Sequence, residues 1–108
     1  MGITSDDMKM SIGRTGVKTV VKISNQFDST RSAEFRSVYE QLLRQPVLST
    51  LVLDMEDIEH FNSSSLGILL RLLDCARLSG KTVVLSRPKP QILRILERAN
   101  FHRLFAIE

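Results

Sequence analysis

The order of strand-like and helix-like segments constrains the fold of this chain more than any other feature. Four segments have the period-two alternation or the short β-branched run of a strand: 8–12, 17–24, 49–54 and 81–86. Three segments repeat apolar residues every three or four positions, as amphipathic helices do: 29–45, 63–79 and 91–100. Strands that alternate with helices are joined by right-handed crossovers. We therefore expect an α/β fold, in which an N-terminal hairpin precedes alternating helices and strands and helices cover a largely parallel central sheet.

Turns and helix ends refine this prediction. Residues 13–16 (GRTG) are predicted to form a four-residue turn between two antiparallel strands, and 25–28 (NQFD) break the alternation of the second strand. The third strand is expected to end at Asp54, and a loop that contains His60 is expected to follow it. Residues 101–107 (FHRLFAI) can form a helical turn and a short last strand.

Each helix carries an apolar face that is predicted to be buried, and the second helix is apolar over most of its surface. The residues expected to face inward are Phe35, Val38, Tyr39, Leu42, Leu43, Leu66, Ile68, Leu69, Leu70, Leu72, Leu73, Cys75, Ala76, Ile92, Leu93, Leu96 and Ala99. No internal repeat and no linker interrupts the sequence, so 1–108 is predicted to be a single domain.

The charge of the chain is modest but unevenly placed. Hydrophobic residues make up 43% and charged residues 25% of the sequence, which is ordinary globular usage and argues against disorder. The net charge is +3 with the bases spread along the chain, so no direct nucleic-acid binding is expected. Four acids and no base lie in 54–59, whereas eight bases and three acids follow from Arg71 onward. A separation of this kind suits docking to another protein.

The sequence also predicts a cytoplasmic location. No apolar stretch approaches the roughly 18 residues of a membrane span, so no membrane insertion is expected, and the first residues do not resemble a secretory signal. The single cysteine, Cys75, cannot form an internal disulfide, which fits a reducing compartment. It lies within a predicted helix, where a buried, inert thiol is expected.

Sequence signatures of catalysis are missing. The chain contains no G-x-x-x-x-G-K-[ST] loop, no G-x-G-x-x-G fingerprint and no G-x-S-x-G elbow. His60 and His102 are far apart, and no cysteine or carboxylate cluster has the spacing of metal ligands. We therefore predict no enzyme activity, no metal site and no cofactor.

The junction before the second helix carries the most chemical information. Asn62 or Ser63 can cap this helix, and the next serines lie in its first turn. A helix N-terminus offers free backbone N–H groups and the positive end of the helix dipole, so it also receives phosphate well. The residues alone fit either ordinary helix capping or a serine that is modified or binds an anion.

Residues 51–54 (LVLD), followed by Ile58, Phe61 and 62–70 (NSSSLGILL), resemble the signature of STAS domains, the sulfate-transporter and anti-sigma-factor-antagonist family. That signature is a buried strand, a short loop, Asp-Ser-Ser-Gly-Leu-Gly and an apolar helix. The resemblance covers nearly the whole chain, with further matching segments at 25–28, 81–86 and 100–105.

The resemblance implies a role and a site. In the bacterial anti-sigma factor antagonists of this family, a partner that is both serine kinase and anti-sigma factor phosphorylates the second serine of the pair. Ser64 is the implied acceptor, with Ser63 and Ser65 as alternatives, and a PP2C-type serine phosphatase is the implied second partner. The implied partner-binding surface comprises Phe27, Asp28, Phe61, Asn62, Ser63, Ser64, Ser65 and Leu66.

This chain departs from the signature twice, because Asn62 stands where Asp is usual and Ser65 where Gly is usual. The function expected from the resemblance is partner switching, in which the unphosphorylated protein binds its partner and phosphorylation releases it. Two other functions stay open: a STAS subunit of a larger assembly such as an ABC transporter, with serines that only cap the helix, and a small α/β domain that binds nucleotide or nucleic acid.

Overall fold

The computed structural model describes residues 8–15 and 17–108, and within the first strand it describes the backbone and Gly13 only. The elements, in chain order, are β1 (Met8–Thr15), β2 (Lys18–Phe27), η1 (Ser29–Arg31), α1 (Ser32–Leu43), β3 (Thr50–Phe61), α2 (Ser63–Leu78), β4 (Thr82–Ser86), α3 (Pro90–Arg98), η2 (Phe101–Arg103) and β5 (Ala106–Ile107). This order confirms the predicted succession of a hairpin and alternating helices and strands. The predicted helical turn and last strand within 101–107 are confirmed as η2 and β5.

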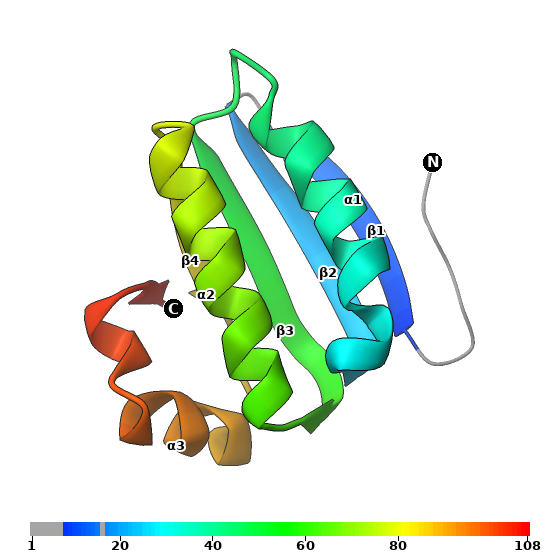
Figure 1. Ribbon diagram of the computed structural model, residues 1–108, viewed down its shortest axis with the longest axis vertical. Helices are drawn as coiled ribbons and strands as arrows, with labels where there is room; N and C mark the ends of the chain where they lie inside the picture. The colour runs from blue at the N-terminus through cyan, green and yellow to red at the C-terminus, as the bar shows by residue number, and fades with distance from the viewer. Residues whose placement is uncertain (1–7, 16) are drawn as a thin grey trace.

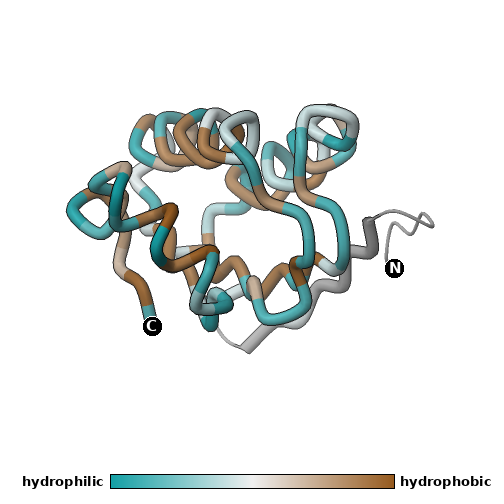
Figure 2. The backbone as a smooth tube through the Cα atoms, turned by 90° about the horizontal axis from the view of Figure 1, so that it is seen from below, coloured by the Kyte–Doolittle hydropathy of each residue, from teal (hydrophilic) through white to brown (hydrophobic). Residues whose placement is uncertain are grey.

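The strands form one sheet in the order β1-β2-β3-β4-β5. β1 pairs with β2 antiparallel, and each later pair is parallel, so the predicted α/β fold with a largely parallel sheet is confirmed. α1 and α2 lie side by side on one face of the sheet (Figure 1), and the view along the helices separates this layer from the sheet (Figure 2). The N-termini of both helices therefore lie at the end of the sheet where β2 and β3 finish.

One hydrophobic cluster joins the helices to the sheet. β2 alternates as a half-buried strand should, with Val21 and Ile23 inside and Lys22 between them less buried. Every residue of α1 that was expected inside is buried, as are Ile92 and Leu96 of α3. α2 is less enclosed than predicted, because Leu70 is 41% exposed. Cys75, expected to be buried, is only half-buried.

The predicted turn at 13–16 is wrong. β1 continues to Thr15, and its register places Gly13 opposite Val20 and Thr15 opposite Lys18. The backbone pairing of the hairpin thus extends through the glycine, which weakens a strand without ending it. In the turn that joins β1 to β2, the structure describes Val17, and Gly16 lies outside the described residues.

The predicted loop after Asp54 is also wrong, because β3 runs on to Phe61 and His60 belongs to it. Ser24 of β2 pairs with Asp57, and Gln26 with His60, so β3 holds one more residue than β2 at each of two bulges. Bulges shift the alternation of inward and outward side chains. Because of this shift and the acidic run, the sequence of 55–61 does not show the regular alternation that predicts a strand. The same pairing keeps 25–27 within β2, where Asn25 adopts a positive φ of 69°.

The acidic run at 54–59 is neutralised by bases that the fold brings beside it. The pairs, with N–O distances of 2.6 to 3.5 Å, are Lys22 with Glu56 and Asp57, Arg87 with Asp54 and Glu56, and Lys89 with Glu59. Hydrogen bonding to Asp57 raises the pKa of Lys22, and hydrogen bonding to Asp54 raises that of Arg87. These ion pairs therefore join β3 to β2 and to the segment after β4. The acids of 54–59 do not form an unpaired acidic docking patch.

Candidate functional site

The N-terminus of α2 is closed by a reciprocal cap. The Asn62 side-chain oxygen Oδ1 accepts hydrogen bonds from the backbone N–H of Ser64 (3.0 Å) and of Ser65 (3.4 Å). In return the Ser65 hydroxyl accepts a hydrogen bond from the backbone N–H of Asn62 at 3.0 Å. This is a capping box, which satisfies N–H groups that a helix start leaves without intrahelical partners. The capping role predicted for Asn62 is confirmed.

Ser65 faces the interior. Its side chain is fully buried, and its hydroxyl donates a hydrogen bond to the backbone carbonyl of Phe27 at the end of β2. The serine that replaces the glycine of the STAS signature thus ties the end of β2 to the start of α2. This burial leaves the Ser65 hydroxyl inaccessible to another protein in this conformation.

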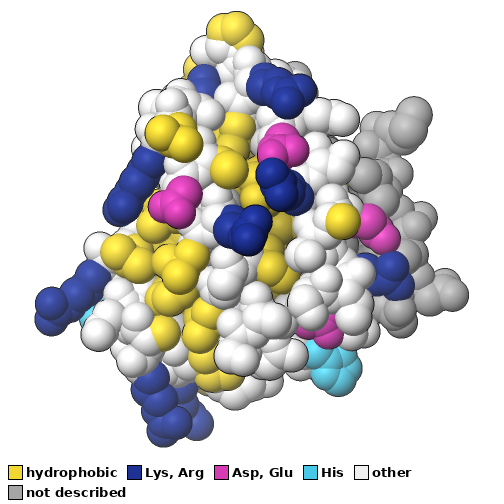
Figure 3. Space-filling model, viewed as in Figure 1, with side chains coloured by type: hydrophobic (Ala, Val, Ile, Leu, Met, Phe, Trp, Pro, Cys, Tyr) yellow, Lys and Arg dark blue, Asp and Glu magenta, His cyan; other side chains and the backbone are white. Residues whose placement is uncertain are grey.

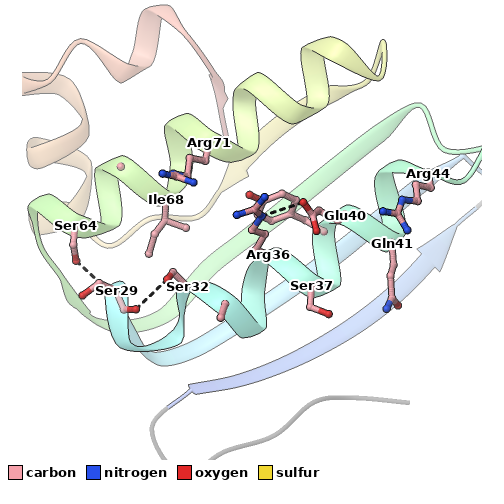
Figure 4. A pocket seen from close by; sticks show the side chains of 13 residues that line it. Ser29, Ser32, Arg36, Ser37, Glu40, Gln41, Arg44, Ser64, Ile68 and Arg71 are labelled. Carbon is pink, nitrogen blue, oxygen red and sulfur yellow. Dashed lines mark hydrogen bonds and ion pairs between the residues drawn. The ribbon is translucent and has the colours of Figure 1, made fainter.

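Ser64 faces outward from the same helical turn. Its hydroxyl donates to Asn62 Oδ1 at 2.6 Å and accepts a hydrogen bond from the backbone N–H of Ser29 at 3.2 Å. Figure 4 shows this second contact bridging the starts of η1 and α2. Ser64 is half-buried, whereas its neighbour Ser63 is exposed. The hydroxyl of Ser64 is therefore both positioned by its neighbours and within reach of a partner.

Asp28 fixes the segment that carries Ser29. Its carboxylate accepts hydrogen bonds from the Thr30 backbone N–H (3.0 Å), from the Thr30 hydroxyl and from the Gln26 side-chain amide. The Thr30 hydroxyl, followed by the Gln26 amide, lowers the pKa of Asp28 below its ordinary value. Because these contacts favour the charged carboxylate, Asp28 is ionised at neutral pH and holds the start of η1 in place.

Phe27 and Phe61 form the apolar floor beneath these polar groups. Their rings stack with centroids 6.2 Å apart, and Phe27 also meets the edge of Phe35 at 5.2 Å. Phe27 is 1% exposed, so it supports the site from inside and offers no surface to a partner. Phe61 and Leu66 pack against the core and are only partly buried. All eight predicted partner-binding residues lie around the junctions of β2 with η1 and of β3 with α2. Two of them, Phe27 and Ser65, are buried and therefore not accessible to a partner in this conformation.

A groove of about 710 Å³ runs between α1 and α2 and begins at Ser64. Three arginines from the two helices line it, namely Arg36, Arg44 and Arg71, and basic side chains accordingly lie over the middle of this face in Figure 3. The one carboxylate in its lining, Glu40, pairs with Arg36 at 3.0 Å. No pattern in the sequence pointed to this groove by itself, because it forms between two helices. The available signal was that Ser64, Gly67, Ile68 and Arg71 share one face of α2 at the spacing i, i+3, i+4, i+7.

Tyr39 also lines the groove but is 2% exposed, so it belongs to the floor between the helices. Burial, with a smaller contribution from the neighbouring Cys75 thiol, raises the pKa of Tyr39 to about 12. Tyr39 is the only tyrosine of the chain, which also contains no tryptophan.

The two histidines belong to other elements than the serines of α2. His60 is exposed near the end of β3, and His102 is exposed in η2. Among the described residues, the Ser64 hydroxyl makes hydrogen bonds with the Asn62 side chain and the Ser29 backbone N–H, and with neither histidine. No cluster of three or more potential metal ligands occurs among the described residues. In that same part of the chain, no helix has the length and apolar character needed to cross a membrane.

Comparisons with solved structures agree with this architecture. The Thermotoga maritima protein TM1081 superposes with a TM-score of 0.81 at 20% identity, covering 91% of this chain and 84% of its own. An anti-sigma factor antagonist from Mycobacterium paratuberculosis gives 0.74 at 18% identity, with coverages of 97% and 89%. The phosphorylated form of the Bacillus cell fate determinant SpoIIAA gives 0.71 at 14% identity, with coverages of 92% and 90%. At these identities the likeness concerns the fold.

Sequence comparison identifies the family. A STAS-domain containing protein of Pseudomonas aeruginosa is 32% identical over 92 residues, which are 85% of this chain and 89% of that protein. The family model of the STAS domain matches residues 9–108, a range that includes the hairpin, the capped serine turn of α2 and the closing η2–β5 segment. On both grounds this chain belongs to the STAS domain family.

Proposed function

We propose that this protein is an anti-sigma factor antagonist that works by partner switching through Ser64. In the unphosphorylated state the face around the α2 N-terminus binds an anti-sigma factor that is also a serine kinase. Phosphorylation of Ser64 releases that partner, and a PP2C-type serine phosphatase restores the binding form. The observation that carries the proposal is the Ser64 hydroxyl, positioned and partly exposed at the start of α2 within the serine motif of the family.

The burial and contacts of the three serines support Ser64 over its neighbours. Ser65 is fully buried and holds β2 to α2, so its phosphorylation would require this turn to open. Ser63 is exposed, but its hydroxyl has no hydrogen bond within the described residues. Ser64 alone combines access with a fixed hydroxyl orientation, which favours in-line transfer of a phosphoryl group.

The start of α2 suits a phosphorylated serine. A phosphoserine brings a charge of about −1.5 to −2, and the positive end of a helix dipole favours a negative group in its first turn. α2 has sixteen residues, so its dipole is fully developed at this end. Asn62, in place of the usual Asp, leaves no carboxylate in contact with the Ser64 hydroxyl. The modification therefore changes the charge of the docking face while the helix stays folded.

The Ser64 hydroxyl donates to the neutral amide oxygen of Asn62, and we propose a binding role for the protein rather than an enzymatic one. We place the protein in the cytoplasm, with residues 1–108 acting as one STAS domain and without a cofactor. The direct targets in this proposal are proteins, not nucleic acid or membrane.

Affinity capture followed by titration tests the proposal. Ser64→Ala and Ser64→Asp proteins are used as bait in extracts of the protein's own cells, and the captured partner is then titrated with each variant. Ser64→Ala is expected to bind, and Ser64→Asp to bind about 30- to 150-fold more weakly, which corresponds to roughly 2–3 kcal/mol. Ser63→Asp places the same charge one residue away and serves as the matched control. Equal affinity of the Ser64→Ala and Ser64→Asp proteins would contradict the switch.

The same capture distinguishes the alternative role in a larger assembly. A subunit of a transporter would be recovered with the other subunits of a membrane ATPase, and charge at Ser64 would not change that recovery. Because the Ser64 hydroxyl also bridges η1 and α2, a purely structural serine predicts loss of stability in Ser64→Ala without any change in partner.

A further inference from the structure

The groove between α1 and α2 has a positive lining. Arg36, Arg44 and Arg71 contribute three guanidinium groups, while the Glu40 carboxylate is already paired with Arg36 at 3.0 Å. Neither Arg44 nor Arg71 has an ion-pair partner within the described residues. A guanidinium group binds carboxylates through two parallel hydrogen bonds, so these side chains can receive acidic groups from outside.

Gly67 keeps the α2 side of the groove open. A Cβ atom at this position would meet no other atom within 4 Å, so the packing of this chain does not require a glycine here. Glycine nevertheless weakens a helix interior. The space beside Gly67 is therefore free for a group that comes from another molecule.

The groove and the proposed acceptor share one helical face. Ser64, Gly67 and Arg71 lie at the spacing i, i+3 and i+7 of α2 and all line the groove. Figure 4 shows Arg71 and Arg36 extending from the two helices along the groove that starts at Ser64. A phosphate on Ser64 would thus lie at the mouth of a groove whose arginines attract anions.

We propose that this groove binds a carboxylate-bearing segment of the protein partner, with Arg71 and Arg44 as the charged contacts and Gly67 as the point of closest approach. A phosphate on Ser64 competes with those carboxylates for Arg71, which explains how modification at one end of the groove releases a segment bound along it. The partner's role rests on the proposed function, but recognition of acidic segments by the groove does not.

The lining favours a peptide over a nucleic acid. The Glu40 carboxylate lies among the arginines of the lining and would repel a continuous row of phosphates. A peptide carries separate carboxylates that can pair with individual arginines and leave room for Glu40 between them.

Binding of a hexaglutamate peptide to the isotope-labelled protein tests this inference, with amide shifts as one readout and Tyr39 fluorescence as another. We expect saturating shifts at the amides of Ser64, Gly67 and Arg71, and none of comparable size with hexaglutamine. Arg71→Glu should weaken binding about 10-fold or more, whereas Arg77→Glu, the same charge change on the same helix outside the groove lining, should change it less than about 2-fold. Equal losses in both variants, or tighter binding of a hexanucleotide RNA than of hexaglutamate, would overturn the proposal.

Two further proteins complete the test. Gly67→Ala fills the space without changing charge and is expected to weaken hexaglutamate binding while the variant stays folded. Protein carrying phosphoserine at position 64 should bind hexaglutamate about 10-fold more weakly than the unmodified protein. If the groove binds hexaglutamate as described but Ser64 is never phosphorylated in cells, the proposed function is wrong, whereas recognition of acidic segments by the groove is supported. If Ser64 is phosphorylated but hexaglutamate does not bind, the groove proposal fails alone.

Discussion

Alanine replacement of each of the three consecutive serines should give three different results, although the chemical change is identical. Ser63 is exposed without a hydrogen bond from its hydroxyl within the described residues, Ser64 is half-buried with two, and Ser65 is fully buried with two. A common offset applies to all three, because alanine has a higher helix propensity than serine by about 0.5 kcal/mol. Differences among the variants therefore report the hydrogen bonds.

The expected magnitudes follow from burial. Ser65→Ala leaves the carbonyl of Phe27 and the N–H of Asn62 without their partner, and an unsatisfied buried group costs about 1–3 kcal/mol. Subtracting the propensity offset from the cost of one buried unsatisfied group gives an expected net loss of about 0.5–2.5 kcal/mol in the free energy of unfolding. Ser64→Ala should lose less than about 1 kcal/mol because water can replace its partly exposed contacts. Ser63→Ala should be neutral or slightly stabilising.

Urea denaturation followed by circular dichroism measures these differences, with unchanged m-values as the check that the unfolded states are comparable. Ser65→Thr keeps a hydroxyl in the same place and serves as a second variant that adds only a methyl group. If Ser65→Ala were no less stable than Ser63→Ala, the buried capping contact would not contribute as described, and the assignment of distinct roles to the three serines would lose its basis.

Three other substitutions test separate parts of the structure. Gly67→Ala should raise the free energy of unfolding by about 0.5–1 kcal/mol, since a Cβ there meets no atom; a lower thermal midpoint would contradict the open groove. Absorbance titration of the single tyrosine should give a midpoint near the pKa of about 12 for Tyr39. Because the unfolded chain releases that proton near pH 10, stability should fall from about pH 10 to 12. Tyr39→Phe should reduce this fall and leave the part that comes from Lys22, whose pKa is also raised; a midpoint near 10 would refute the burial of Tyr39. Arg87→Ala should lower the urea midpoint at neutral pH by leaving the buried Asp54 carboxylate without its guanidinium; an unchanged midpoint would show that the pair is not needed.

Local sequence patterns predicted the succession of elements because each helix and most strands repeat their apolar residues regularly. The α2 cap was readable for the same reason, since Asn62 precedes an apolar helix by one residue. The C-terminal part of β3 was not, because its two bulges break the alternation and its acids resemble a solvated loop. In the fold those acids are paired with Lys22, Arg87 and Lys89, and that arrangement depends on tertiary pairing.

The candidate site was predicted in part for a related physical reason. A helix N-terminus is a local feature, so the serines could be placed from the sequence. The different roles of Ser64 and Ser65 depend on which side of the helical turn faces Phe27. The hydrogen bond from the Ser29 backbone N–H to Ser64 joins segments that are far apart in the chain. The groove requires both helices at once, since Arg36 comes from α1 and Arg71 from α2. These contacts arise only when the sheet brings the two helices together.

Partner switching through Ser64 is tested most directly by mass spectrometry of intact protein and peptides, purified from the protein's own cells in growth and under stress. We expect a single phosphate on Ser64, and not on Ser63 or Ser65, whose occupancy changes between the two conditions. Complete absence of phosphate in every condition, with the protein recovered in one stable complex throughout, would contradict it.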